Sequence, residues 1–203
     1  MRPVTRTPIR ILFGTILATL LLSVASFAQT TQQSAPDFSS IKIKNFGQMD
    51  ERFYRGSQPK DKEDYEALAA LGIKTVIDLQ EKPKDYEKSM VEALGMRYVN
   101  IPMPTKEYPK PEWVDAFLRV VDDPATGKFF VHCAGGRHRT GSMGAVYRYT
   151  KYNWTFEQVY AEMKKFDFYT SWGHGDYKKF VEDYGQQIQA KKAATANAAS
   201  GTR

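Results

Sequence analysis

The apolar residues of this chain recur with two periods, and the change from one period to the other predicts an α/β fold. Short apolar runs predict strands over 52–55, 73–79, 96–101 and 128–132, and an alternating run predicts another over 41–46. Helical spacing predicts helices over 61–71, 86–94, 111–121, 140–150, 155–166 and about 177–190. We therefore expect a central, mostly parallel sheet of about four to five strands, flanked by helices on both faces.

Several helix ends carry the residues that usually terminate helices. Gly72 and Gly95 follow two of the predicted helices, where glycine commonly stops a helix. Thr155 and Gln158 are spaced as a capping box, and Asp176 is placed to act as the N-cap of the last helix. These residues divide the region 41–190 into one domain of alternating strands and helices.

The first 28 residues have the composition of an export signal. Three arginines precede an uncharged, largely apolar run over 11–22, and the small residues Ser26 and Ala28 fit a signal-peptidase site. We expect cleavage after Ala28 and a periplasmic or secreted product; an uncleaved membrane anchor is the alternative, because the run over 11–28 is only slightly short for a membrane span. Residues 29–40 are expected to be a flexible linker and residues 191–203 a disordered tail.

Charge and residue usage exclude several function classes. The leader carries three arginines and no acidic residue, so its removal lowers the formal net charge from +6 to +3. A mildly basic domain of this kind does not indicate a general nucleic-acid binder. Three histidines and one cysteine offer no zinc-ligand spacing, and no dinucleotide-binding glycine motif is present. We expect no metal, no cofactor and a monomer.

The candidate chemistry lies in residues 132–141, His-Cys-Ala-Gly-Gly-Arg-His-Arg-Thr-Gly, between a predicted strand and a predicted helix. The start of the helix favours an anion, and it lowers the pKa of a cysteine thiol placed there. Five residues separate Cys133 from Arg139, whose planar guanidinium can hold two phosphoryl oxygens while the thiolate attacks phosphorus. Thr140 can donate to the thiolate, and residues 134–138 supply the backbone that surrounds the phosphate, namely Ala134, Gly135, Gly136, Arg137 and His138.

This stretch resembles the signature of the cysteine-dependent protein tyrosine phosphatase superfamily: His, Cys, five residues, Arg, Ser or Thr, Gly. Its Gly-Arg-His-Arg-Thr-Gly is similar to the Gly-Lys-His-Arg-Thr-Gly of plant and fungal atypical dual-specificity phosphatases, one branch of which cleaves inositol pyrophosphates. The likeness extends from residues 53–59, Phe-Tyr-Arg-Gly-Ser-Gln-Pro, to about residue 166. It implies a dual-specificity phosphatase fold and a phosphocysteine intermediate.

The loop over 102–110 departs from the superfamily pattern, in which an aspartate at about this place protonates the leaving group. Glu107 is the only carboxylate before the next helix. We therefore nominate Glu107 as the general acid; a surface carboxylate beside Lys106 and Lys110 is the alternative. Without an efficient general acid, substrates with an alkoxide leaving group react most slowly, because an alkoxide leaves less readily than a phenolate or a phosphate. Phosphotyrosine or a pyrophosphate is therefore favoured as substrate over phosphoserine.

Other charged residues are candidates for substrate contacts around the loop. They are Arg55, Lys82, Lys84, Lys106 and Lys110, together with the side chains of Arg137 and His138. His132 is expected to orient the loop, and His174 is either a site residue or merely exposed. The expected partner is a phosphorylated substrate, either a phosphotyrosine protein or an inositol polyphosphate. Two alternatives to a phosphatase remain at this point: an inactive phosphate-binding module and a rhodanese-like sulfurtransferase.

Overall fold

The computed structural model describes residues 38–200, with side chains through residue 198. The predicted signal peptide (1–28), most of the predicted linker (29–37) and the last three residues lie outside the described part of the chain. The elements are β1 (Gly47–Gln48), β2 (Phe53–Ser57), α1 (Lys62–Ala70), β3 (Ile73–Gln80), α2 (Glu87–Ala93), β4 (Arg97–Met103), α3 (Pro111–Asp122), η1 (Pro124–Thr126), β5 (Lys128–Cys133), α4 (Arg139–Tyr152), α5 (Phe156–Lys165) and α6 (Gly175–Ser200).

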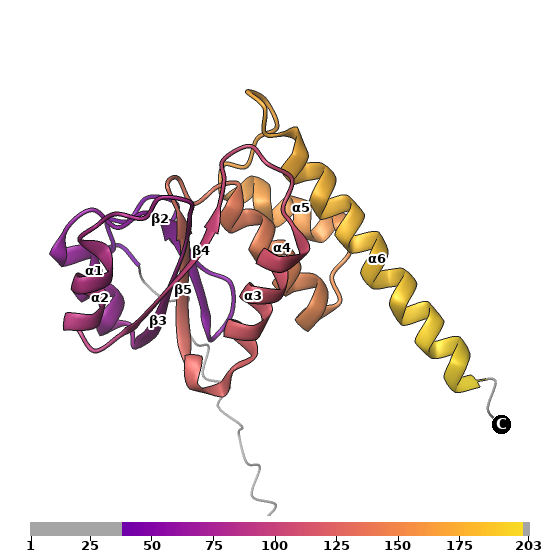
Figure 1. The fold of residues 1–203 in the computed structure, drawn as a ribbon, viewed down its shortest axis with the longest axis horizontal. Helices are drawn as coiled ribbons and strands as arrows, with labels where there is room; N and C mark the ends of the chain where they lie inside the picture. Colours follow the sequence, from indigo (N-terminus) through magenta and orange to yellow (C-terminus); the bar gives the residue numbers. More distant parts are fainter. Residues whose placement is uncertain (1–37, 201–203) are drawn as a thin grey trace, which may run out of the picture. The chain divides into compact units, whose positions relative to one another are not determined.

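The strands form one five-stranded sheet in the order β1-β2-β5-β3-β4. The short β1 pairs antiparallel with β2, and all other neighbours are parallel. Helices α1 and α2 cover one face of the sheet, while α3, α4, α5 and α6 lie on the other (Figure 1). The expected α/β fold, with a mostly parallel sheet and helices on both faces, is confirmed.

Strand β5 lies at the centre of this sheet, between β2 and β3. Its side chains alternate between the two helical layers: Phe130 packs with the α1–α2 layer, whereas Phe129 and Val131 join the cluster formed with α3 to α6. Because both faces are covered, the strand is apolar throughout its middle, as expected of a central parallel strand. This placement puts residues 132 and 133 at the carboxyl edge of the sheet, on opposite faces.

Local sequence signals account for several helix boundaries. The Thr155 hydroxyl accepts from Gln158 N at 3.4 Å and the Gln158 side chain accepts from Thr155 N at 2.9 Å, so the predicted capping box starts α5. The Asp61 carboxylate accepts from Asp64 N at 3.1 Å and caps α1. The prediction that Asp176 is the N-cap of the last helix is wrong, because α6 already begins at Gly175 and Asp176 lies within it.

The strand expected over 41–46 is wrong. Residues 41–46 contain turns, and Asn45 has a left-handed backbone with φ 54°. The alternating apolar pattern there has another cause: the rings of Phe38 and Phe46 pack edge to face at 5.2 Å, and Phe46 stacks on Phe130 at 6.1 Å. The apolar residues of this segment cover the sheet without joining it.

The C-terminal segment is more ordered than the sequence suggested. We expected residues 191–203 to be disordered, yet α6 continues through Ser200. Alanine is the best helix former, and the alanines of this segment extend the helix although residues 191–198 are exposed. Among residues 38–200, no helix has both the length and the hydropathy needed to cross a membrane.

Candidate active site

Cys133 is the last residue of β5, at the carboxyl edge of the parallel strands, where open α/β sheets bind ligands. Its side chain is 3% exposed. Burial raises the pKa of the thiol, but the charge of Arg139, the Thr140 hydroxyl and the N–H groups of Thr140 and Gly135 together lower that pKa below its ordinary value. These groups therefore favour the ionised form of the sulfur.

Arg139 begins α4 and reaches back across the edge of the sheet. Its Nη1 donates to the carbonyl oxygens of Leu79 at 3.3 Å and Met103 at 3.0 Å, at the ends of β3 and β4. In the described part of the chain no hydrogen bond uses Nε or Nη2 of this guanidinium. One nitrogen thus fixes the guanidinium and the others remain for phosphoryl oxygens.

The backbone between Cys133 and Arg139 forms a tight anion-binding loop. Within residues 38–200, the N–H groups of residues 135–138 donate to no carbonyl or side-chain oxygen. Gly136 has φ +66°, and a Cβ there would lie 2.4 Å from the carbonyl oxygen of Gly56. Only glycine lets the loop lie this close to β2, and the loop N–H groups are left to bind a phosphate.

Two residues outside the signature hold the carbonyl oxygens of this loop. Arg55 Nη2 donates to Gly136 O at 2.6 Å, and Asn45 Nδ2 donates to Gly135 O at 3.0 Å. Arg55 is 1% exposed and lies 4.0 Å from the Phe166 ring centroid; burial lowers its pKa to about 10, which keeps it cationic at neutral pH. The expectation that Arg55 meets substrate is wrong, because its guanidinium is enclosed beneath the loop.

The side chain of His138 also faces inward rather than toward substrate. Its Nε2 lies 2.9 Å from Tyr169 O, and its ring stacks on His174 with centroids 3.7 Å apart and planes 4° apart. Burial and the neighbouring charges of His174, Arg137 and Arg139 lower the pKa of His138 to about 4, so this imidazole is neutral at pH 7. His174, which the sequence left open, is thus a packing partner of the loop and is itself buried.

A cavity of about 820 Å³ borders the signature loop. Ala134, Gly135 and Arg137 line one side of it, and Lys84 contributes from the loop after β3. The remaining lining residues are Lys44, Asn45, Ser57, Gln58, Lys60, Tyr86 and Asp167. Three lysines and one arginine face a single carboxylate, so the cavity favours an anion with several charges.

Of the four lysines that the sequence analysis named as candidates for substrate contacts, only one lines this cavity. Lys84 lines it, but Lys82 does not, although both are exposed on one loop. Lys110 instead lies 2.8 Å from Glu107 Oε1 and 5.0 Å from the Trp113 ring centroid. Lys106 has its aliphatic chain beside Gly173. Lys44 and Lys60 were missed by the sequence analysis, since only the fold brings their segments to the loop.

Glu107 lies in the loop between β4 and α3, and this loop is fastened to α6. Tyr177 Oη donates to Pro104 O at 3.2 Å and accepts from Lys106 N at 3.3 Å. Burial raises the pKa of Tyr177, and both Cys133 and Glu107 raise it further, whereas Arg139 lowers it. Tyr177 therefore ties the backbone of the Glu107 loop to α6.

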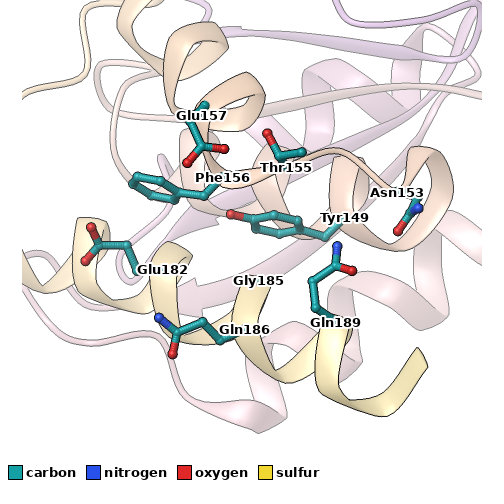
Figure 2. A pocket seen from close by; sticks show the side chains of 9 residues that line it. All are labelled: Tyr149, Asn153, Thr155, Phe156, Glu157, Glu182, Gly185, Gln186 and Gln189. Atoms are coloured by element: carbon teal, nitrogen blue, oxygen red, sulfur yellow. The ribbon is translucent and has the colours of Figure 1, made fainter. Parts of the chain in front are cut away.

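A second cavity, of about 710 Å³, lies away from the signature loop between α4, α5 and α6. Figure 2 shows Tyr149 of α4 across its middle, with Glu157 and Glu182 at one end. Its lining includes no lysine, arginine, histidine or cysteine. Two carboxylates without a facing cation repel a phosphate, so this cavity is not the candidate active site.

A parallel sheet whose central strand delivers a cysteine into an arginine-anchored loop is the fold of protein-tyrosine and dual-specificity phosphatases. The model of the family described as "DSP-PTPase phosphatase fused to NAD+ kinase" matches residues 23–183. The chain belongs to this family and is a phosphatase of the protein-tyrosine/dual-specificity type. Its membership sets aside the sulfurtransferase alternative.

Curated and solved relatives agree with this assignment. The chain is 26% identical over 148 residues to inositol diphosphatase DSP5 of Arabidopsis thaliana, covering 69% of each chain. Its fold is similar to the catalytic core of the PP-IP phosphatase SIW14 of S. cerevisiae, with 23% identity, TM-score 0.61, and 76% and 94% of the two chains covered. It is also similar to P. aeruginosa TpbA, solved with pTyr, with 22% identity, TM-score 0.62, and 80% and 94% covered.

Proposed function

We propose that this chain hydrolyses phosphorylated substrates through a phosphocysteine intermediate on Cys133. The thiolate attacks phosphorus, the S–P bond forms and the bond to the leaving oxygen breaks, while Arg139 and the loop N–H groups hold the three equatorial oxygens. Glu107 gives its proton to the leaving oxygen. Water then attacks the phosphocysteine and gives a proton to the Glu107 carboxylate, the S–P bond breaks and inorganic phosphate leaves. The thiolate returns with the Thr140 hydroxyl as its hydrogen-bond donor.

One observation carries this proposal: Arg139 is tied to the ends of two strands and lies close enough to Cys133 to lower the pKa of the thiol. Glu107 as the acid is supported by its position as the only carboxylate of its loop, and Tyr177 holds the backbone of that loop against α6.

The experiment for the nucleophile compares the wild-type chain with Cys133→Ser on para-nitrophenyl phosphate. We expect turnover to fall by more than about a thousandfold, because serine lacks an ionised nucleophile at neutral pH. The inactive binding module predicts no turnover in either protein. Equal turnover by both proteins would contradict the phosphocysteine route.

For the substrate class, the cationic cavity beside the loop supports a polyanion, and an inositol pyrophosphate is our first choice. Its leaving group is a phosphate, which departs more easily than the alkoxide released from inositol hexakisphosphate. A relative is named inositol diphosphatase, and another is named a PP-IP phosphatase. A phosphotyrosine peptide is the second candidate, and the solved complex of TpbA with pTyr supports it.

Rates on an inositol pyrophosphate, inositol hexakisphosphate and a phosphotyrosine peptide distinguish these candidates. We expect the inositol pyrophosphate to have the highest kcat/KM, with hexakisphosphate the slowest. Lys84→Gln, inside the cavity, should raise KM for the pyrophosphate several-fold, and Lys82→Gln, on the same loop outside it, is the matched control. A faster peptide reaction that neither lysine affects would favour the phosphotyrosine candidate.

Export is a further part of the proposal and is supported by the sequence of residues 1–28. We propose that the mature protein begins at Gln29 and works outside the cytoplasm, in the periplasm or the medium. Expression of the full chain in a bacterium, followed by fractionation and N-terminal sequencing, tests this. A membrane fraction that retains Met1 would support the uncleaved anchor instead.

A further inference from the structure

Directly behind Cys133, on the opposite face of the sheet, three ionisable side chains meet in the interior. His132, Asp78 and Glu87 are each 0% exposed. Asp78 pairs with His132 across β3 and β5, and Glu87 comes from the start of α2. The His132 ring stacks on Phe130, with centroids 5.7 Å apart, which places it in the α1–α2 layer. The mechanism described above uses none of these three groups.

Glu87 is the carboxylate in direct contact with the imidazole. His132 Nε2 lies 2.8 Å from Glu87 Oε1, the distance of a close ion pair, whereas Nδ1 lies 3.8 Å from Asp78 Oδ1. Asp78 is engaged elsewhere, since its oxygens accept from Tyr98 Oη at 3.0 Å and from Gln80 N at 2.8 Å. Glu87 is therefore the carboxylate nearest to His132, and it favours the protonated imidazole more than Asp78 does.

The ionisable groups around His132 favour its protonated form. Facing it are Asp78 from β3, Glu87 from α2 and Cys133 from its own strand, with the phenols of Tyr65 from α1 and Tyr98 from β4 nearby. Burial lowers the pKa of His132, but Glu87 first, then Asp78 and Cys133, raise it above its ordinary value overall. Burial raises the pKa of Glu87, but the close contact with His132 and the charge of His132 outweigh burial, so that the pKa of Glu87 is lowered overall.

A buried charge is tolerated only when it is paired, and here the pair adjoins the nucleophile by one peptide bond. We propose that Glu87 is a positioning residue that holds His132 as a cation behind Cys133, and that this cation helps to keep the sulfur ionised. The proposal rests on Cys133 being the nucleophile. Thiolate and imidazolium stabilise each other, because opposite charges on adjacent buried residues attract more strongly than they would in water, and the charge of Cys133 is among those that favour protonated His132.

Alkylation by iodoacetate tests this without reference to turnover. Cys133 is the only cysteine of the chain, so the alkylation rate as a function of pH reports the ionisation of this one thiol. Glu87→Gln keeps the size of the side chain and removes its charge, which should leave His132 neutral. We expect the rate profile to move to higher pH, with at least about a threefold lower rate on its acidic side. The acidic limb of kcat/KM should move with it and recover at alkaline pH.

Three further variants make the result specific. Glu92→Gln removes an exposed carboxylate from the same helix and should leave the profile unchanged. Glu87→Asp retains the charge and should move the profile less than Glu87→Gln does. In a His132→Gln background, adding Glu87→Gln should move the profile no further, because no imidazole remains. The double variant can also replace a single variant that folds poorly, because it leaves neither Glu87 nor His132 as an unpaired buried charge.

Several outcomes would overturn the proposal. An alkylation profile that is the same in the wild-type chain and a folded Glu87→Gln variant would do so, as would equal shifts with Glu92→Gln. Stoichiometric zinc in the purified protein would also do so, since ligand atoms of Asp78, Glu87 and His132 lie within 4.8 Å of one another. A failure of the phosphocysteine route can be distinguished from a failure of this proposal, because Cys133→Ser would then retain turnover in the presence or absence of the Glu87 carboxylate.

Discussion

The loops that follow β5 and β4 both lie at the carboxyl edge of the sheet, but different contacts hold them in place. The signature loop after β5 is held from several directions, by Asn45 and Arg55 on its carbonyl oxygens and by the contact of Gly136 with β2. The loop after β4, which carries Glu107, is tied mainly to α6: Tyr177 bonds to its backbone, and Tyr108 Oη donates to Asp183 Oδ2 at 2.9 Å.

In the mechanism that we propose, this difference separates phosphoryl binding from proton donation. Binding the phosphoryl group requires donors fixed before the substrate arrives, because preorganised donors need no rearrangement in the transition state. Proton donation requires only that an acid reach the leaving oxygen, and an exposed loop can provide this. We therefore expect changes in the signature loop to affect every substrate, and changes at Glu107 to depend on the leaving group.

The largest expected effect is that of Arg139→Lys. Lysine keeps the charge but loses the planar arrangement that binds two oxygens while bonding to Leu79 and Met103. We expect kcat to fall on the order of a hundredfold to a thousandfold on all substrates. Single-turnover rates with para-nitrophenyl phosphate measure this, and circular dichroism confirms folding. A loss confined to one substrate would contradict the difference between the loops.

Glu107→Gln should have a smaller and more selective effect. We expect kcat for phenyl phosphate, whose leaving group is poor, to fall on the order of a hundredfold. The loss for para-nitrophenyl phosphate should be much smaller, because its leaving group needs no proton. Glu112→Gln, an exposed carboxylate at the start of α3, is the control. Equal rates of the variant and the wild type on both esters would place Glu107 in a surface pair with Lys110 only.

Gly136→Ala tests how tightly the signature loop is packed. An added Cβ would lie 2.4 Å from Gly56 O with φ in the left-handed region, so we expect the free energy of unfolding to fall by about 2 kcal/mol or more. Gly135→Ala is the matched control, because its nearest neighbours would be 3.9 Å away on the Arg137 side chain. Urea denaturation measures the free energy of unfolding of both variants. If Gly136→Ala is as stable as Gly135→Ala, the loop can move away from β2.

The smallest effect is expected from removing residues 191–203. Residues 191–198 are exposed, and the bond of Lys192 Nζ to Asn153 Oδ1, at 2.6 Å, is at the surface. The free energy of unfolding should change by less than about 1 kcal/mol. Gly185→Ala, further back on α6, should cost more, since its Cβ would lie 2.7 Å from the Tyr149 ring. A truncation that destabilises more than Gly185→Ala would show that the tail packs on the domain.

Sequence reasoning succeeded where a structure is encoded over a few neighbouring residues. The strand, turn and helix around Cys133 follow from one run of ten residues, and hydrophobic periods predicted the sheet and its two helical layers. It failed for residues 41–46, where apolar residues alternate but pack on the sheet from a turn. It also failed for the alanine-rich segment after residue 190, where high helix propensity extends α6.

By itself, the sequence determined the α/β class and the make-up of the loop, because a cysteine, an arginine and the glycines between them stand at a fixed short spacing. Only the tertiary structure decided which charges meet. It enclosed Arg55 and His138, turned Lys84 but not Lys82 toward the loop, and brought Glu87 to His132 across 45 residues of chain. Such pairings depend on strand order and helix packing, and no local pattern records them.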